Sequence, residues 1–144
     1  MAIGMIAEEI KQEMMEAVTL RREWEMLEQE RHDLLLALEE SVATESDFVI
    51  AEEVARECEA LRRALTKRQL RNWARINRVP MTPLQKRVLG MRFVRGCPWG
   101  DIIREQKKAK QYLIREHNKA LNKVAEHEMQ ALQKNGKSDL KVTG

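Results

Sequence analysis

The sequence is poor in the residues that favour β-sheets, tight turns and disulfides. Aromatic side chains make up only 4% of the 144 residues, and there are 6 glycines, 3 prolines and 2 cysteines. Leucine, methionine, glutamate, lysine and arginine are abundant instead, and this usage is typical of a helix-rich protein. We therefore expect an all-α fold.

Residues able to hold a metal or to perform catalysis are few and scattered. Cys58 and Cys97 stand alone, 39 positions apart and outside any metal-ligand spacing, so we expect small buried thiols. His32, His117 and His127 are dispersed, and helical periodicity places His117 on an inward face. The sequence has no glycine-rich phosphate loop, nucleophile elbow or Cys-x-x-Cys motif. It therefore predicts no enzyme, no cofactor, no metal site and no small-molecule substrate.

Long apolar runs are missing as well. No uncharged apolar stretch approaches the roughly 20 residues that span a bilayer. The first residues, Met1 to Gly4, have neither a basic segment nor a cleavage pattern. We expect no membrane contact and a cytoplasmic location.

One region lacks acidic residues altogether. Residues 1–59 hold 17 acidic and 5 basic side chains, residues 60–100 hold no acidic and 11 basic ones, and residues 101–144 hold 6 acidic and 10 basic ones. A stretch of 41 residues without Asp or Glu creates a positive field that attracts polyanions. The alternative is that this basic segment pairs with the acidic N-terminal segment, within one chain or between two.

The acidic segment carries a heptad pattern. With Ile3 at position a, nine of eleven a and d positions are apolar. Glu13 and Arg31 are the exceptions, and Met14 and Leu35 beside them are the expected substitutes. The pattern predicts an amphipathic helix over about residues 3–41, which must bury its seam against another helix. A second helix is expected over about residues 47–78. The two could form an antiparallel hairpin, or the first could form a homodimeric coiled coil with a second chain. The expected interface residues are Ile6, Ile10, Leu20, Trp24, Leu27 and Leu34.

Arginines recur along one face of the second helix. Arg68, Arg71, Arg75 and Arg78 stand three or four positions apart, and Trp73 lies among them. Such a stripe suits phosphates, which guanidinium groups bind bidentately. The stripe is therefore a candidate DNA-binding surface. The alternative is a solvated helix face with Trp73 packed inward.

Several signals mark helix boundaries after residue 60. Thr66 and Gln69 have the spacing of a capping box, so either a third helix begins there or the second continues. Pro80 disfavours helical angles at Val79, which predicts a boundary between a helical arm of residues 1–79 and a C-terminal domain of residues 80–136. The last helix is expected to end at the Asn135-Gly136 C-cap, with a frayed tail over residues 137–144.

Residues 82–125 carry the pattern of three helices. Thr82 can cap a helix whose first turn holds Pro83, and Gly96 supplies a turn after it. In the last of these helices one arc is apolar and the opposite arc is polar and cationic. Polar and cationic side chains like those of this arc bind base edges and phosphates in DNA. The alternative is that the arc is an ordinary exposed helix face. The expected DNA-binding residues of this arc are Lys108, Lys110, Gln111, Arg115, Asn118, Lys119 and Asn122.

This region resembles the helix-turn-helix of sigma-factor region four and of the phage-encoded transcription regulators built on it. The resemblance covers about a third of the chain. The family has a Leu-Gly-apolar turn before its recognition helix, where this sequence has Gln106-Lys107-Lys108. We therefore expect a remodelled turn, with the second and third helices angled differently or merged. The matching positions are Thr82-Pro83-Leu84-Gln85, Val88-Leu89, Met91-Arg92-Phe93, Gly96, Trp99, Ile102 and Arg115 through Ala120-Leu121.

The resemblance implies a DNA-binding transcription regulator of phage type that acts with host RNA polymerase at promoters. Double-stranded DNA and RNA polymerase are the implied partners, and the cytoplasm of a phage-infected or lysogenic bacterium is the implied location. Late-gene activators and antiterminators both fit. Two other classes stand as alternatives. One is a DNA-packaging adaptor similar to the small terminase subunit, and the other is a protein-binding inhibitor of RNA polymerase without DNA contact.

Overall fold

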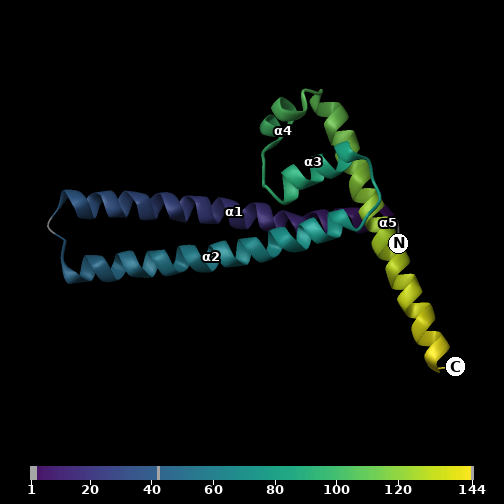
Figure 1. Cartoon of the computed structure of the whole chain (residues 1–144), viewed down its shortest axis with the longest axis horizontal. Helices are drawn as coiled ribbons and strands as arrows, with labels where there is room; N and C mark the ends of the chain where they lie inside the picture. Colours follow the sequence, from purple (N-terminus) through teal and green to yellow (C-terminus); the bar gives the residue numbers. More distant parts are fainter. Residues whose placement is uncertain (1–2, 42, 144) are drawn as a thin grey trace.

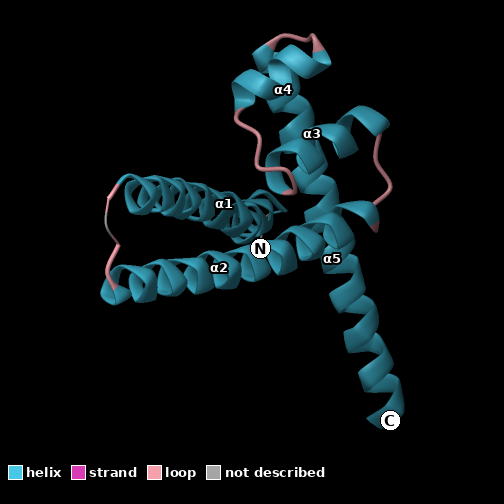
Figure 2. Ribbon diagram, turned by 60° about the vertical axis from the view of Figure 1, so that its left-hand side comes forward, coloured by secondary structure: helices cyan, strands magenta, loops and turns pink. Residues whose placement is uncertain are grey.

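The chain folds into helices joined by short connectors. The computed structural model describes the backbone of residues 3–41 and 43–143 and the side chains up to residue 134. The helices are α1 (Ile3–Glu40), α2 (Glu45–Asn77), α3 (Pro83–Phe93), α4 (Trp99–Gln106) and α5 (Lys110–Thr143), and the described residues contain no strand. A long α1–α2 hairpin projects from a cluster formed by α3, α4 and α5 (Figures 1 and 2). The expected all-α fold is confirmed.

Local capping explains where the hairpin turns. The Ser41 hydroxyl donates to the Ala37 carbonyl at 2.8 Å, which satisfies a carbonyl at the end of α1. Thr44 caps α2 in a reciprocal capping box with Asp47. The second helix therefore begins at Glu45, two residues before the expected start, because Asp47 is the third residue of the helix and not its first. Of the two arrangements that the sequence allowed, the structure has the antiparallel hairpin within one chain.

The possible break at Thr66 does not occur. The Thr66 hydroxyl donates to the Arg62 carbonyl at 2.9 Å, one turn earlier, and α2 continues to Asn77. A capping box forms only where the backbone leaves the helix, so the spacing of Thr66 and Gln69 alone does not start one. The arm is therefore built from two uninterrupted helices.

The main core lies where the hairpin meets the C-terminal helices. The predicted boundary at Pro80 falls in the connector between α2 and α3, but the core extends across it. The N-terminal half of α1 is thus packed together with α3 and α5. The buried residues of this core are Ala7, Ile10, Met14, Val18, Ile76, Val79, Leu89, Phe93, Ala120, Leu121, Val124 and Ala125.

The buried face of α1 departs from the heptad assignment. Met14 is 0% exposed and replaces the exposed Glu13 in the buried stripe, as expected, whereas Leu35 is 44% exposed and does not replace Arg31. A straight helix has 3.6 residues per turn, so its buried stripe drifts away from a strict seven-residue repeat. Packing against several helices, rather than one coiled-coil partner, also widens the stripe. Among the expected interface residues, Ile10 is buried in the main core, and the others are half-buried: Ile6, Leu20, Trp24, Leu27 and Leu34.

One buried amide joins three helices. Asn72 is 2% exposed, and its Nδ2 donates to the Met14 carbonyl at 3.0 Å and to the Phe93 carbonyl at 2.9 Å. Phe93 is the last residue of α3, where a carbonyl has no partner within its own helix. Asn72 therefore fixes α3 against α1 and α2.

The C-terminal helix is longer than the sequence predicts. α5 continues to Thr143 and passes through Asn135 and Gly136, where the C-cap and the start of a frayed tail were expected. A glycine costs a helix only about 1 kcal/mol against alanine and does not end it unless the backbone turns left-handed. None of the helices, within the described residues, has an apolar stretch long enough to cross a membrane.

Candidate nucleic-acid interface

The start of α3 is fixed by the predicted cap. Thr82 and Gln85 form a reciprocal capping box, and Pro83 occupies the first turn. Gln85 is also buried, and its side chain joins α3 to α5: its Nε2 donates to Glu116 at 2.8 Å and its Oε1 accepts from Lys123 at 2.8 Å. These contacts orient α5 relative to α3.

The turn between α4 and α5 has a left-handed residue where the resembled family has glycine. Lys107 has φ 54° and ψ 42° and ends α4, and α5 begins at Lys110. The helices are therefore not merged, because a short turn separates them. The left-handed conformation costs a residue with a side chain roughly 1–2 kcal/mol. Burial of Ile102 and Leu113, both 0% exposed on either side of the turn, offsets that cost.

Lys107→Gly is expected to raise the free energy of unfolding by about 0.5–1 kcal/mol, because glycine avoids the left-handed strain but loses more entropy on folding. Urea denaturation measures the change. Lys108→Gly is the matched control, since it removes the same charge from the same turn at a position without positive φ. Equal effects of the two substitutions would show that Lys107 carries no strain.

A second core holds α3, α4 and α5 together. Its fully or nearly fully buried members come from α3, α4 and α5, with half-buried side chains around them. Gly96, at φ 69°, makes the turn before α4, as the sequence predicted. The three helices therefore form one packed unit. The core residues are Val88, Met91, Ile102 and Leu113, surrounded by Leu84, Cys97, Trp99 and Ile103.

The polar arc of α5 faces solvent along its whole length. Its opposite arc, including Leu113, Ala120 and Val124, is buried. The Lys108 ammonium lies 5.6 Å from the centre of the Tyr112 ring, and Lys119 pairs with Glu116 at 3.5 Å. We call the exposed arc and the turn before it the recognition face, and its members are Lys108, Lys110, Gln111, Arg115, Asn118, Lys119 and Asn122.

Most of the recognition face has no competing carboxylate. In the described part of the chain, no ion pair engages Lys108, Lys110 or Arg115. Their charges are free to bind an anion, because an anion need not displace an internal partner first. The sequence prediction of a polar, cationic and accessible helix face thus agrees with the geometry.

His117 lies directly behind the recognition face. The ring is 3% exposed, stacked on Phe93 at 5.5 Å and edge-on to Trp99 at 5.2 Å. Its Nδ1 lies 3.0 Å from Asn118 Oδ1, which can only accept, so Nδ1 carries the proton. Burial lowers the pKa of His117, which favours the neutral ring. His117 is in the core as expected, although its Nε2 has no hydrogen-bond partner among the described residues.

Half of the predicted arginine stripe on α2 is engaged in internal ion pairs. Arg68 lies 2.6 Å from Glu16 of α1. Arg75, only 16% exposed, pairs with Glu13 at 2.7 Å and with Glu128 of α5 at 2.8 Å. The hydrogen bonds that Arg75 donates to Glu128 raise the pKa of Arg75 despite its burial.

Arg68 and Arg75 therefore pair with the acidic N-terminal segment of the same chain, which was the alternative to phosphate binding. The two side chains hold α1, α2 and α5 together, and they are removed from the candidate DNA-binding set. Arg71 and Arg78 are exposed. Trp73 is 54% exposed rather than packed inward.

The two cysteines are not joined by a disulfide. Cys58 is buried and Cys97 half-buried, and both are free thiols. Burial raises the pKa of Cys58, which disfavours the thiolate. Among the described residues no group of histidine, cysteine and carboxylate side chains has the arrangement of a metal site.

Sequence reasoning missed the two buried amides that position this site. Asn72 falls on the stripe of Leu65 and Ile76 at helical spacing, so its burial was detectable. Gln85 was recognised as a cap, but its bonds to α5 were not. Comparison of the chain with protein-family models, curated proteins and solved structures found no match.

Proposed function

We propose that the chain is a DNA-binding transcription regulator of phage type, which binds duplex DNA with α5 and acts with host RNA polymerase at promoters. One observation carries the proposal. A short helix, a turn with a left-handed residue and a longer helix expose a cationic, amide-rich face while their other faces are buried. This is the arrangement that places a recognition helix in the major groove.

The recognition face has the chemistry that base readout requires. An α-helix is about 10–12 Å wide with its side chains, and the major groove is about 12 Å wide. Arg115 can donate two hydrogen bonds to guanine, and Asn118 or Gln111 can bond bidentately to adenine. Lys108 and Lys110, at the N-terminal end of α5, would neutralise phosphates. The bond from His117 reduces the rotational freedom of Asn118 before DNA binds.

The hairpin arm supports a protein partner rather than a nucleic-acid partner. Its outer part, residues 23–59, holds 13 acidic and 2 basic side chains. A negatively charged surface of this kind repels the phosphates of a nucleic acid. DNA on the recognition face leaves the arm free, so RNA polymerase is the proposed partner for the arm.

The test is a binding measurement with DNA sites selected from a random duplex pool. Arg115→Ala and Asn118→Ala are each expected to weaken binding to a selected site by about 1–3 kcal/mol and to relax base preference. Lys108→Ala should weaken binding to all sequences and reduce the salt slope by about 1. Fluorescence anisotropy over a series of salt concentrations measures both quantities.

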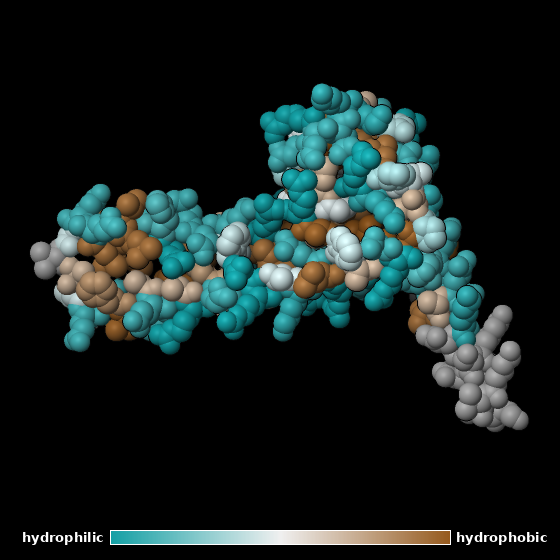
Figure 3. Space-filling model, viewed as in Figure 1, coloured by the Kyte–Doolittle hydropathy of each residue, from teal (hydrophilic) through white to brown (hydrophobic). Residues whose placement is uncertain are grey.

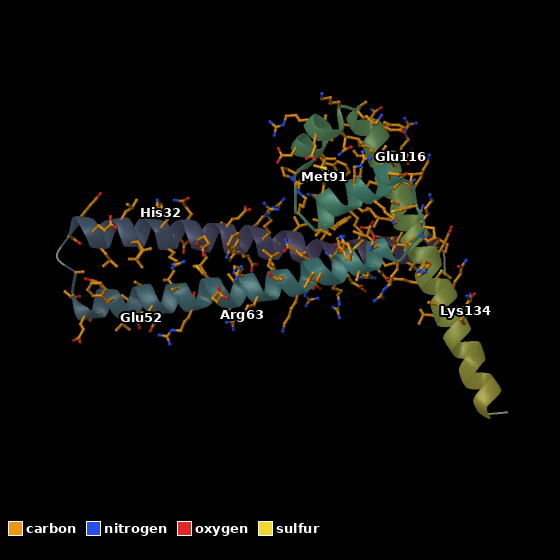
Figure 4. All side chains as sticks on the ribbon, in the orientation of Figure 1. His32, Glu52, Arg63, Met91, Glu116 and Lys134 are labelled. Carbon is orange, nitrogen blue, oxygen red and sulfur yellow. The ribbon has the colours of Figure 1, made fainter. Side chains whose placement is uncertain are left out.

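The control is Lys134→Ala, which removes an exposed charge far along α5 (Figure 4). Retained binding in all three recognition-face variants would contradict the proposal, as would absence of DNA binding in dilute buffer. Capture of purified polymerase without any DNA retention would favour the inhibitor class instead. A ring-sized assembly in light scattering would favour the packaging adaptor.

A further inference from the structure

Two exposed apolar patches lie at opposite ends of the hairpin arm. The tip patch is near the turn between α1 and α2, and apolar residues are visible at the far end of the arm (Figure 3). The root patch is on α2 near α3, where Leu70 is 63% and Trp73 54% exposed. The tip patch comprises Leu35, Leu36, Phe48, Val49 and Ile50, and the root patch comprises Thr66, Gln69, Leu70, Trp73 and Val94.

The residues around the two patches carry opposite charges. Exposed glutamates surround the tip patch on both helices: Glu39, Glu40, Glu45, Glu52 and Glu53. On α2 the charges around the root patch are mainly basic, because Lys67 adjoins the patch and residues 60–100 contain no acid. Arg63, with its side chain 76% exposed, lies one turn before Thr66 and pairs with Glu59 at 3.3 Å, one turn further from the patch. Figure 4 shows Glu52 nearer the end of the arm and Arg63 further towards its base.

We propose that the acidic tip patch of one chain binds the basic root patch of a second copy, so that the protein associates head to tail. Each patch offers exposed apolar side chains to the other, and each is bordered by charges opposite to those of its counterpart. Two tips, or two roots, would instead bring like charges together, which disfavours a symmetric dimer through either patch.

The contact cannot form within one chain. Val49 and Trp73 lie on the same uninterrupted helix, 24 residues apart, which corresponds to about 36 Å at 1.5 Å per residue. A straight helix holds its own tip and root apart at that distance. The partner of each patch must therefore come from another molecule.

Head-to-tail contacts have a recognisable consequence. Because the two surfaces differ, each added copy leaves one free tip and one free root, and growth does not stop at a dimer. Sedimentation velocity of protein freed of nucleic acid should therefore give an average mass that rises with concentration beyond that of a dimer. Added salt should lower the mass, because the charged borders are exposed to solvent.

Complementary variants give the decisive experiment. The tip variant is Phe48→Gln with Ile50→Gln, and the root variant is Leu70→Gln with Trp73→Gln. All four side chains are exposed and glutamine favours helices, so the fold should be retained. Each variant alone should be monomeric. An equal mixture should form a heterodimer and nothing larger, because only one functional tip and one functional root remain.

The matched control is Leu132→Gln, which replaces an exposed leucine outside both patches and should associate like the unaltered chain. Three outcomes would overturn the proposal: an unaltered chain that stays monomeric at every concentration, a single-patch variant that still dimerises by itself, or a mixture that stays monomeric. Circular dichroism of each variant separates lost association from lost structure. The assay contains no DNA, so its result is independent of the proposed function.

A charge exchange tests the borders separately. Glu52→Lys with Glu53→Lys should abolish association, and so should Arg63→Glu with Lys67→Glu. Placing both exchanges in one chain gives a basic tip and an acidic root and should restore association, because only the reversed pair is then present. Failure of the chain with both exchanges to associate would count against the charge pairing.

Discussion

Asn72→Asp is expected to lower the free energy of unfolding by about 3–5 kcal/mol at neutral pH, the cost of a buried charge without a partner. The amide that donates to the carbonyls of Met14 and Phe93 would become a carboxylate facing two acceptors. Burial and the facing oxygens would raise the pKa of the new carboxyl in the folded state. A raised folded-state pKa means that stability is regained as the pH falls and the group takes up a proton.

Urea denaturation at neutral and at mildly acidic pH measures both effects. Asn77→Asp is the matched control, because Asn77 is exposed at the end of the same helix and should cost less than about 1 kcal/mol. If Asn72→Asp were no more destabilising than this control, the bonds from Asn72 would not hold α3 against the arm.

Met14→Ala is expected to lower the free energy of unfolding by about 2–5 kcal/mol, the usual range for a buried methionine truncated to alanine. Met14 is fully buried in the core that α1 shares with α3 and α5. The cavity should therefore loosen the packing of α3 and α5 as well as the arm. Amide hydrogen exchange of Leu121 and Val124 in α5 should accelerate along with that of α1.

Met26→Ala provides the control, since Met26 is on the same helix but 67% exposed, and its loss should change stability by less than about 0.5 kcal/mol. Unchanged exchange in α5 of the Met14→Ala protein would mean that residues 80–136 fold independently of α1. The two methionines thus distinguish a shared core from two separate domains.

Features set by local chemistry were predictable from the sequence. The helical periodicity, the cap at Thr82 and the turn at Gly96 each depend on residues close together in the chain, and each is confirmed. The polar arc of α5 was predictable for the same reason. Its exposure follows from the burial of the apolar arc on the other side of one helix.

Features set by long-range packing were not predictable. The spacing of Arg68 and Arg75 suits a phosphate-binding stripe, and only the approach of α1 and α5 shows that glutamates pair with them. The possible merger of α4 and α5 was not excluded by the sequence, which gives the cost of a left-handed Lys107 but not the burial that offsets it. The sequence predicts too short an α5, because Asn135-Gly136 has the pattern of a C-cap although the helix continues through it.

The packing of α1 on α5 has a consequence for synthesis of the protein. Ile10 and Met14 leave the ribosome long before Val124, their neighbour in the main core. Until then α1 lacks the core contacts that α5 contributes. Contacts between distant parts of a chain also form slowly. A prematurely terminated product would lack that closing helix and its recognition face together. Only translation through α5 would therefore yield a molecule that carries both the complete core and the proposed DNA-binding face.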